Sequence, residues 1–197
     1  MVGIAGGLIG SRTSAPLGSF DLLQTTVLGG NTNSVSFNNL NSTYGTTYQH
    51  LQIRFTFRPT NTDTSLLARM NDDTNGANYN GVWMESAGSG VGQSTRTDTN
   101  SLIFFYPQDF SNSVAGAFYV GILDILDPFE TSKNTTIRCF LGSTGTNPKV
   151  GLSTGGWFNT AALTSFGLSV GTGNPAPWQG SNFTANSRFS LYGIKGA

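Results

Sequence analysis

The sequence predicts an all-β protein, namely a jelly-roll-like antiparallel β-sandwich with an extended N-terminal arm. Lys and Glu, which favour long helices, together number only five among 197 residues, whereas glycine alone numbers 26. Aromatic residues reach 12%, which supplies apolar area for a packed core. Short runs rich in Phe, Tyr, Val and Ile lie between Gly, Asn and Pro turns, as is typical of a sandwich or barrel.

A chain of 197 residues most simply makes one such domain, because single all-β domains often reach this size. We therefore expect residues 19–197 to form one β-sandwich and residues 1–18 to form an assembly arm. The sequence shows no internal repeat, heptad pattern or linker that would divide the domain further.

In the first half of the domain, residues 48–59 form the longest predicted strand, which alternates in polarity and ends at Pro59. Residues 71–77, rich in Asn, Asp and Gly, predict a hairpin turn between two strands, and residues 88–100 predict a polar loop. The strands expected here are residues 19–30, 33–40, 48–59, 64–72, 78–86 and 101–107.

In the second half, residues 115–126 are apolar in both alternating sets, which predicts a strand covered on both sides. A turn follows at Pro128, and a Gly- and Pro-rich loop spans residues 171–182. The strands expected here are residues 115–126, 135–143, 149–159, 162–170 and 187–197.

The strand at 48–59 also contains the single histidine of the chain. Its alternation predicts that the row from Leu51 to Phe57 lies in the core, whereas His50, Arg54 and Arg58 face solvent or a partner subunit. The single cysteine, Cys139, could act as a nucleophile only with that histidine as its base. The sequence favours the alternative, a small buried residue on a strand.

Two acidic patterns could each form a metal or catalytic site, or could have only a structural role. Residues 71–76 match the first half of a calcium loop, but the closing acidic residue is missing, and the same residues suit a turn. Asp124 and Asp127 could be paired carboxylates, but residues three apart on a strand face opposite sides. We therefore predict no catalytic residue, no metal site and no cofactor.

Three tryptophans near predicted turns, Trp83, Trp157 and Trp178, are candidates for surface recognition. Aromatic side chains carried by turns can stack on sugar rings or anchor a protein interface. They can equally cover the open ends of a β-sandwich. The sequence leaves both interpretations open.

The charge balance limits the possible partners. The formal net charge is zero, and the ten basic residues are scattered, which does not favour binding to nucleic acid. No stretch approaches the roughly 20 apolar residues of a membrane span, so we expect no membrane partner. Near-zero charge offers little electrostatic resistance to self-association.

The predicted arm combines apolar residues with four glycines before its first basic residue. Such a segment is expected to dock on the domain's own surface or on a neighbouring chain. The candidate assembly residues are Val2, Ile4, Leu8, Ile9 and Arg12.

Six segments together resemble small structural proteins of tailed-bacteriophage virions. They are "GLIGSRTSAPLGSFDLL", "TYQHLQIRFTFRP", "ARMNDDTNGANYN", "GILDILDPFETSKNTTIR", "GGWFNTAALTSFGLSVGTGN" and "FTANSRFSLYGIKGA", in this order. The resemblance covers nearly the whole chain, and none of its segments is a catalytic motif.

The resemblance implies a non-enzymatic virion component located on the capsid surface and assembled in the host cytoplasm. One implied role is a capsid cement or decoration protein, a homotrimer that binds the major capsid protein and ties neighbouring capsomers together. The alternative is a tail or head fibre subunit that binds a host receptor or glycan. A hydrolase with two carboxylates in a cleft ranks far behind both.

Overall fold

The computed structural model describes residues 19–61, 64–87, 90–96, 100–104, 116–143, 148–172 and 178–196. The predicted arm, residues 1–18, lies outside the described residues, and so do its candidate assembly residues.

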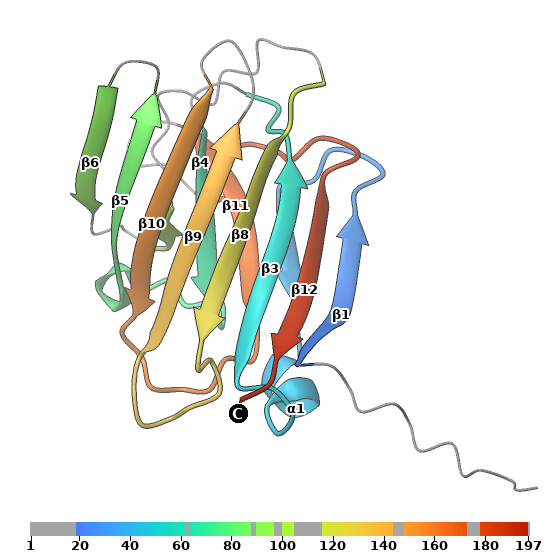
Figure 1. Ribbon diagram of the computed structural model, residues 1–197, viewed down its shortest axis with the longest axis vertical. Helices are drawn as coiled ribbons and strands as arrows, with labels where there is room; N and C mark the ends of the chain where they lie inside the picture. The colour runs from blue at the N-terminus through green and yellow to red at the C-terminus, as the bar shows by residue number, and fades with distance from the viewer. Residues whose placement is uncertain are drawn as a thin grey trace, which may run out of the picture.

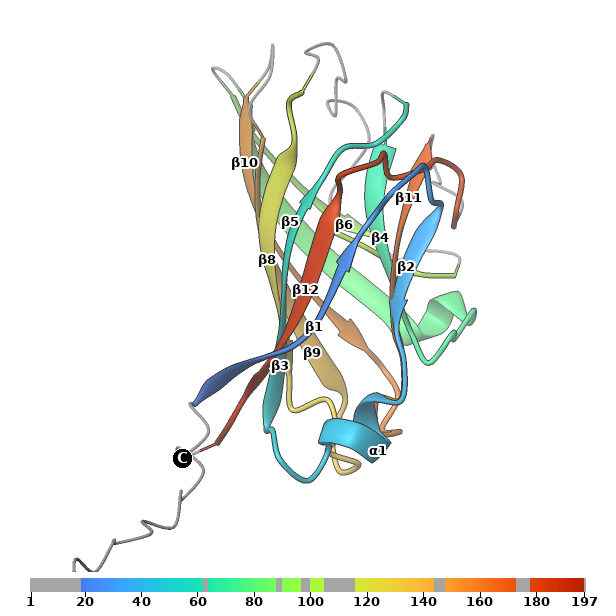
Figure 2. The same ribbon diagram turned by 90° about the vertical axis from the view of Figure 1, so that its right-hand side faces the viewer.

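The described residues form twelve strands in two antiparallel sheets that face each other (Figures 1 and 2). The large sheet has eight strands in the order β1-β12-β3-β8-β9-β10-β5-β6, and the small sheet has four in the order β2-β11-β4-β7. The predicted antiparallel β-sandwich is therefore confirmed. The strands are β1 (Phe20–Val27), β2 (Ser34–Phe37), β3 (His50–Phe57), β4 (Thr64–Met70), β5 (Tyr79–Ala87), β6 (Gly90–Arg96), β7 (Leu102–Ile103), β8 (Tyr119–Leu126), β9 (Thr135–Ser143), β10 (Lys149–Trp157), β11 (Phe166–Thr172) and β12 (Arg188–Ile194).

The core lies between the two sheets and is built from alternate residues of each strand. On β3 the predicted row is buried throughout, and Arg54 on the opposite face is exposed. A cluster of aromatic rings fills one part of the core, where Phe57 packs against Tyr119 and Phe183 with ring centroids 5.4 and 5.3 Å apart. A short helix, α1 (Leu40–Tyr44), lies at one end of the sandwich and buries Leu40 there (Figure 2).

The predicted hairpin at residues 71–77 is wrong. The strands that flank it, β4 and β5, belong to different sheets, so the turn carries the chain across the sandwich. Asn71 and Asp72 adopt left-handed backbone conformations, which their short polar side chains tolerate. The side chain of Asn71 accepts hydrogen bonds from the backbone of Thr164 and Ser165, which fixes the crossing against the segment before β11. A short 3-10 helix, η1 (Gly76–Asn78), completes it.

The predicted polar loop at residues 88–100 contains a strand. β6 pairs with β5 and forms one edge of the large sheet, a position where a sequence with few apolar residues can form a strand through its backbone hydrogen bonds. In contrast, the predicted strand at 101–107 is reduced to the two residues of β7 among those described.

The two-sided burial predicted for residues 115–126 is also wrong. One face of β8 packs into the core, but Val120 on the other face is 54% exposed and Ile122 is also exposed. The apolar residues on both faces of β8 therefore have different roles, and the outward set belongs to the surface described below.

Candidate interaction surface

His50 and Cys139 lie on opposite sides of the large sheet. Cys139 is on the core face of β9, where it is fully buried, and burial raises the pKa of its thiol, with a smaller contribution from the charge of Asp124. His50 is on the outward face of β3, since its neighbour Leu51 points into the core. The two side chains form no catalytic pair, and Cys139 is the small buried strand residue that the sequence favoured.

His50 has a carboxylate neighbour that the sequence did not identify. Its Nδ1 accepts a hydrogen bond from the backbone N–H of Asp127 at 3.0 Å and lies 3.2 Å from an oxygen of that carboxylate. Hydrogen bonds from Lys133 lower the pKa of Asp127, burial opposes this, and Gln49 adds to the lowering. Lys133 and Gln49 also donate hydrogen bonds to this carboxylate. Asp127 therefore connects the start of β3 to the turn after β8.

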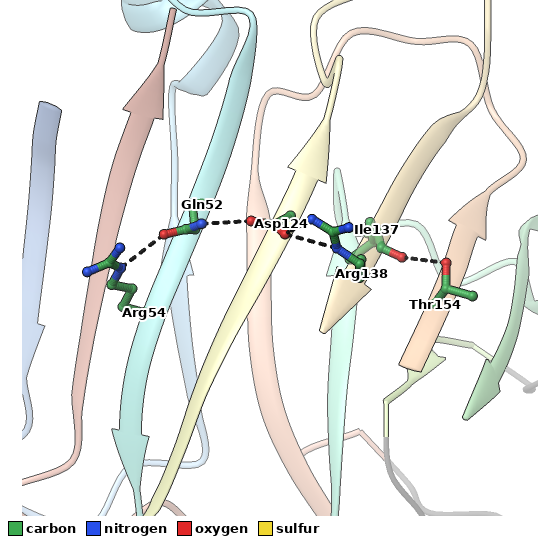
Figure 3. Close-up of polar contacts among 6 residues, drawn as sticks. All are labelled: Gln52, Arg54, Asp124, Ile137, Arg138 and Thr154. Atoms are coloured by element: carbon green, nitrogen blue, oxygen red, sulfur yellow. Dashed lines mark hydrogen bonds and ion pairs between the residues drawn. The ribbon is translucent and has the colours of Figure 1, made fainter. Parts of the chain in front are cut away.

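Asp124 belongs to a different polar group, a row of side chains across the outer face of the large sheet (Figure 3). Its carboxylate accepts hydrogen bonds from Gln52 at 2.8 Å and from the guanidinium of Arg138 at 2.7 Å. Arg54 continues the row by donating to Gln52. Asp124 and Asp127 therefore bind separate partners, so they are not a shared catalytic pair.

In the segment that resembles a calcium loop, the carboxylate of Asp73 makes hydrogen bonds within the protein. The carboxylate of Asp73 accepts from Asn78 at 2.6 Å, from the indole N–H of Trp157 at 2.7 Å and from the backbone of Asn75 at 2.8 Å. Burial raises the pKa of this carboxyl, but these hydrogen bonds outweigh it, so the pKa lies below its ordinary value. Across the described part of the chain, no group of three His, Cys, Asp or Glu side chains is arranged to hold a metal ion.

Surface recognition by Trp83 and Trp157 is contradicted by their burial. Trp157 is only 1% exposed and Trp83 only 6%, because both point from the large sheet into the interior. Trp178 remains partly exposed and lies on the small sheet, where the guanidinium of Arg69 stacks over its ring at 4.5 Å and Leu67 packs beneath it. It covers one face of the small sheet and not an open end of the sandwich, and its role in surface recognition stays a prediction.

The exposed residues that sequence reasoning missed lie on the outer face of the large sheet. Strand register places Ile122, Phe140, Leu152 and Met84 side by side in one row across β8, β9, β10 and β5. A second row includes Val120 and Val150, with Gly142 between them. We call these six apolar residues the outer apolar face: Met84, Val120, Ile122, Phe140, Val150 and Leu152, all of which are exposed.

The outer apolar face is hollowed beside Phe140. A shallow depression of about 310 Å³ lies over β5 and β10, where Met84, Val150 and Leu152 line it. Phe140 stands along its β9 side and is 52% exposed. The polar row of Figure 3 borders the face, because Asp124, Arg138 and Thr154 occupy the next register position on their strands.

β10 reverses the usual alternation of a surface strand. Val150 and Leu152 point outward, whereas Gly151 and Ser153 point into the core. A shift of one residue would bury the apolar pair, but it would also expose Trp157, which is 1% exposed in this register, so this indole determines which set of β10 faces the core. In this register the hydroxyl of Ser153 is buried without a hydrogen-bond partner. The alternation in "KVGLST" could have revealed the outward pair, but the sequence did not show which set faced the core.

No protein-family model and no curated protein matches this sequence. Among solved structures, the chain is similar to an alginate lyase from Chlorella virus, with 10% sequence identity and a TM-score of 0.29 over 90% of this chain and 89% of that one. Among the described helices, none has the length and apolar character needed to cross a membrane.

Proposed function

We propose that this chain is a non-enzymatic virion structural protein that works as a capsid cement or decoration protein. On this proposal it binds the major capsid protein on the outside of a phage head and stabilises neighbouring capsomers. The observation that carries the proposal is the outer apolar face, a continuous exposed surface on four strands of a β-sandwich. The largest exposed apolar patch of a protein is often a functional contact surface.

The resemblance to phage structural proteins supplies the virion part of the proposal, and the described residues of its segments form strands and turns of this sandwich. The described polar residues support a structural role as well. Three carboxylates accept hydrogen bonds that join neighbouring strands or turns, namely those of Asp73, Asp124 and Asp127. These hydrogen bonds stabilise the fold. A low charge and a surface rich in Ser, Thr and Asn suit a protein that packs against copies of a repeating shell.

The test is to mix the purified full chain with phage capsids stripped of their accessory proteins and to image the particles. We expect stoichiometric density at symmetry-related positions on the outside of the shell. Stripped capsids should also withstand higher temperature once the chain is bound, because a ligand that binds the assembled state stabilises it. The control is the same chain with capsids that retain their accessory proteins, whose sites are already filled.

A chain that leaves the capsids bare but adheres to host cells would contradict the cement role. That result would support the alternative, a tail or head fibre subunit that binds a host receptor or glycan. Trp178, the one of the three tryptophans that is partly exposed, would then be the first side chain to replace.

A further inference from the structure

We infer that the outer apolar face is a self-association surface, on which a second copy of this chain docks face to face across a two-fold axis. The inference rests on the proposed assembly role, but it assigns the outer apolar face to a second copy in place of the capsid protein, and a two-fold pair in place of the homotrimer that the resemblance implies. It does not depend on capsids for its test. It also leaves the rest of the molecule available to contact the shell.

The area of the face is suited to a homodimer. From their exposed fractions, its six side chains expose on the order of 500 Å² of surface. Polar side chains around them bring the contact toward the roughly 800 Å² per partner of a stable interface. An apolar centre with a polar rim is the usual composition of such an interface.

The shape of the face is complementary to itself. Phe140 projects beside the depression that Met84 and Leu152 line. In a two-fold interface, if residue i of one copy contacts residue j of the other, residue j of the first copy also contacts residue i of the second. A projection beside a hollow on one copy therefore meets the hollow of the other copy, and the reverse. A two-fold rotation therefore places each Phe140 ring in the depression of the opposite copy. The absence of a side chain at Gly142 leaves room for this approach, since an added Cβ there would meet no atom nearer than 3.9 Å.

The charged side chains that border the face have polar or aromatic partners within one copy. Arg138 binds Asp124 at 2.7 Å on one border of the face. Arg54, which lies beside Ile122 in strand register, donates to Gln52 and stacks over the rings of Phe20 and Tyr192. The Arg138–Asp124 pair therefore presents no unbalanced charge at this border. A formal net charge of zero removes long-range repulsion between the copies as well.

β10 contributes two residues of the outer apolar face against the usual alternation of a surface strand. The strand buries the hydroxyl of Ser153 without a hydrogen bond while Val150 and Leu152 remain in water. Exposure of this apolar pair to water is unfavourable in a monomer. The Ser153 hydroxyl faces the core and is not affected by docking. Docking of a second copy on the outer apolar face removes that pair from water and makes both faces of β10 buried.

The test is sedimentation equilibrium of the full chain between about 1 and 100 μM, the range in which a moderate homodimer dissociates. We expect the mass to rise from one copy to two. Phe140→Asp and Ile122→Asp should each weaken the dimer at least tenfold, because each buries a charge at the centre of the contact. Leu22→Asp is the matched control, since this exposed residue lies on β1 at the edge of the sheet and should leave the dimer unchanged. Circular dichroism checks that each variant is folded.

A wild-type chain that stays monomeric throughout this range would overturn the inference. So would a trimer, because a two-fold contact closes at two copies, or a dimer that both outer-face variants leave intact. If the chain is monomeric yet binds stripped capsids in a manner that Phe140→Asp abolishes, the capsid protein occupies the face. That outcome refutes self-association and supports the proposed function, so the two proposals fail separately.

Discussion

At the scale of single residues, Asp73 holds three segments together. Its carboxylate binds the turn after β4, the helix η1 and the indole of Trp157 on β10. Asp73→Asn removes the charge and one acceptor oxygen, so at least one of these donors loses its partner. We expect a loss of about 1–3 kcal/mol in the free energy of unfolding, measured with urea at neutral pH. Asp72→Asn is the control, because that side chain is exposed and its left-handed backbone suits asparagine.

The same carboxylate should contribute to acid sensitivity. Its pKa is lower in the folded chain than the ordinary value of 3.8, so its contribution to stability is complete above that value and is lost as the pH falls through the folded pKa. The wild-type chain should therefore lose stability below about pH 4 more steeply than Asp73→Asn. Equal slopes for the two chains would show that these hydrogen bonds do not favour the ionised carboxylate.

At the scale of elements, Gly121 shows how tightly β8 packs against β3. A Cβ built at this position would lie 2.5 Å from Cε2 of Phe55 and 2.9 Å from the backbone oxygen of Phe140. Gly121→Ala should destabilise the fold by about 1–3 kcal/mol, because the ring must leave a filled core. The matched control is Gly156→Ala on β10, where the nearest atom would be a ring carbon of Phe158 at an ordinary 3.5 Å. Equal thermal midpoints for the two variants would contradict this packing.

Element by element, the sequence predicted strands better than their pairing. β3 was predicted from its alternation, because one face is buried and the other is polar. The turn at residues 71–77 has the composition of a hairpin, yet it joins two sheets, since turn residues specify a local bend and not the destination of the next strand. β6 was missed because an edge strand needs backbone partners more than apolar side chains.

At the scale of the whole molecule, the candidate surface could not be predicted from the sequence. Apolar residues at 120, 122, 140, 150 and 152 are visible in the sequence, but alternation alone does not show which set faces the core. The outer apolar face exists only because β8, β9, β10 and β5 lie side by side in register, although β5 is far from the others along the chain. Likewise, Trp83 and Trp157 lie near turns in sequence but point into the interior of the sandwich.

The predicted arm and the outer apolar face should have separable roles in assembly. The described core is built from residues after position 18, and β1 pairs with β12 from Phe20 onward, so deletion of residues 1–18 should leave a folded sandwich. We expect the truncated chain to keep its thermal midpoint within about 2 °C and to keep its self-association, because the outer apolar face is unchanged. Its occupancy on stripped capsids should fall to background if the arm is the tether to the shell. Capsid binding that survives the deletion would show that the sandwich itself holds the contact, and loss of the dimer instead would assign the arm to the second copy.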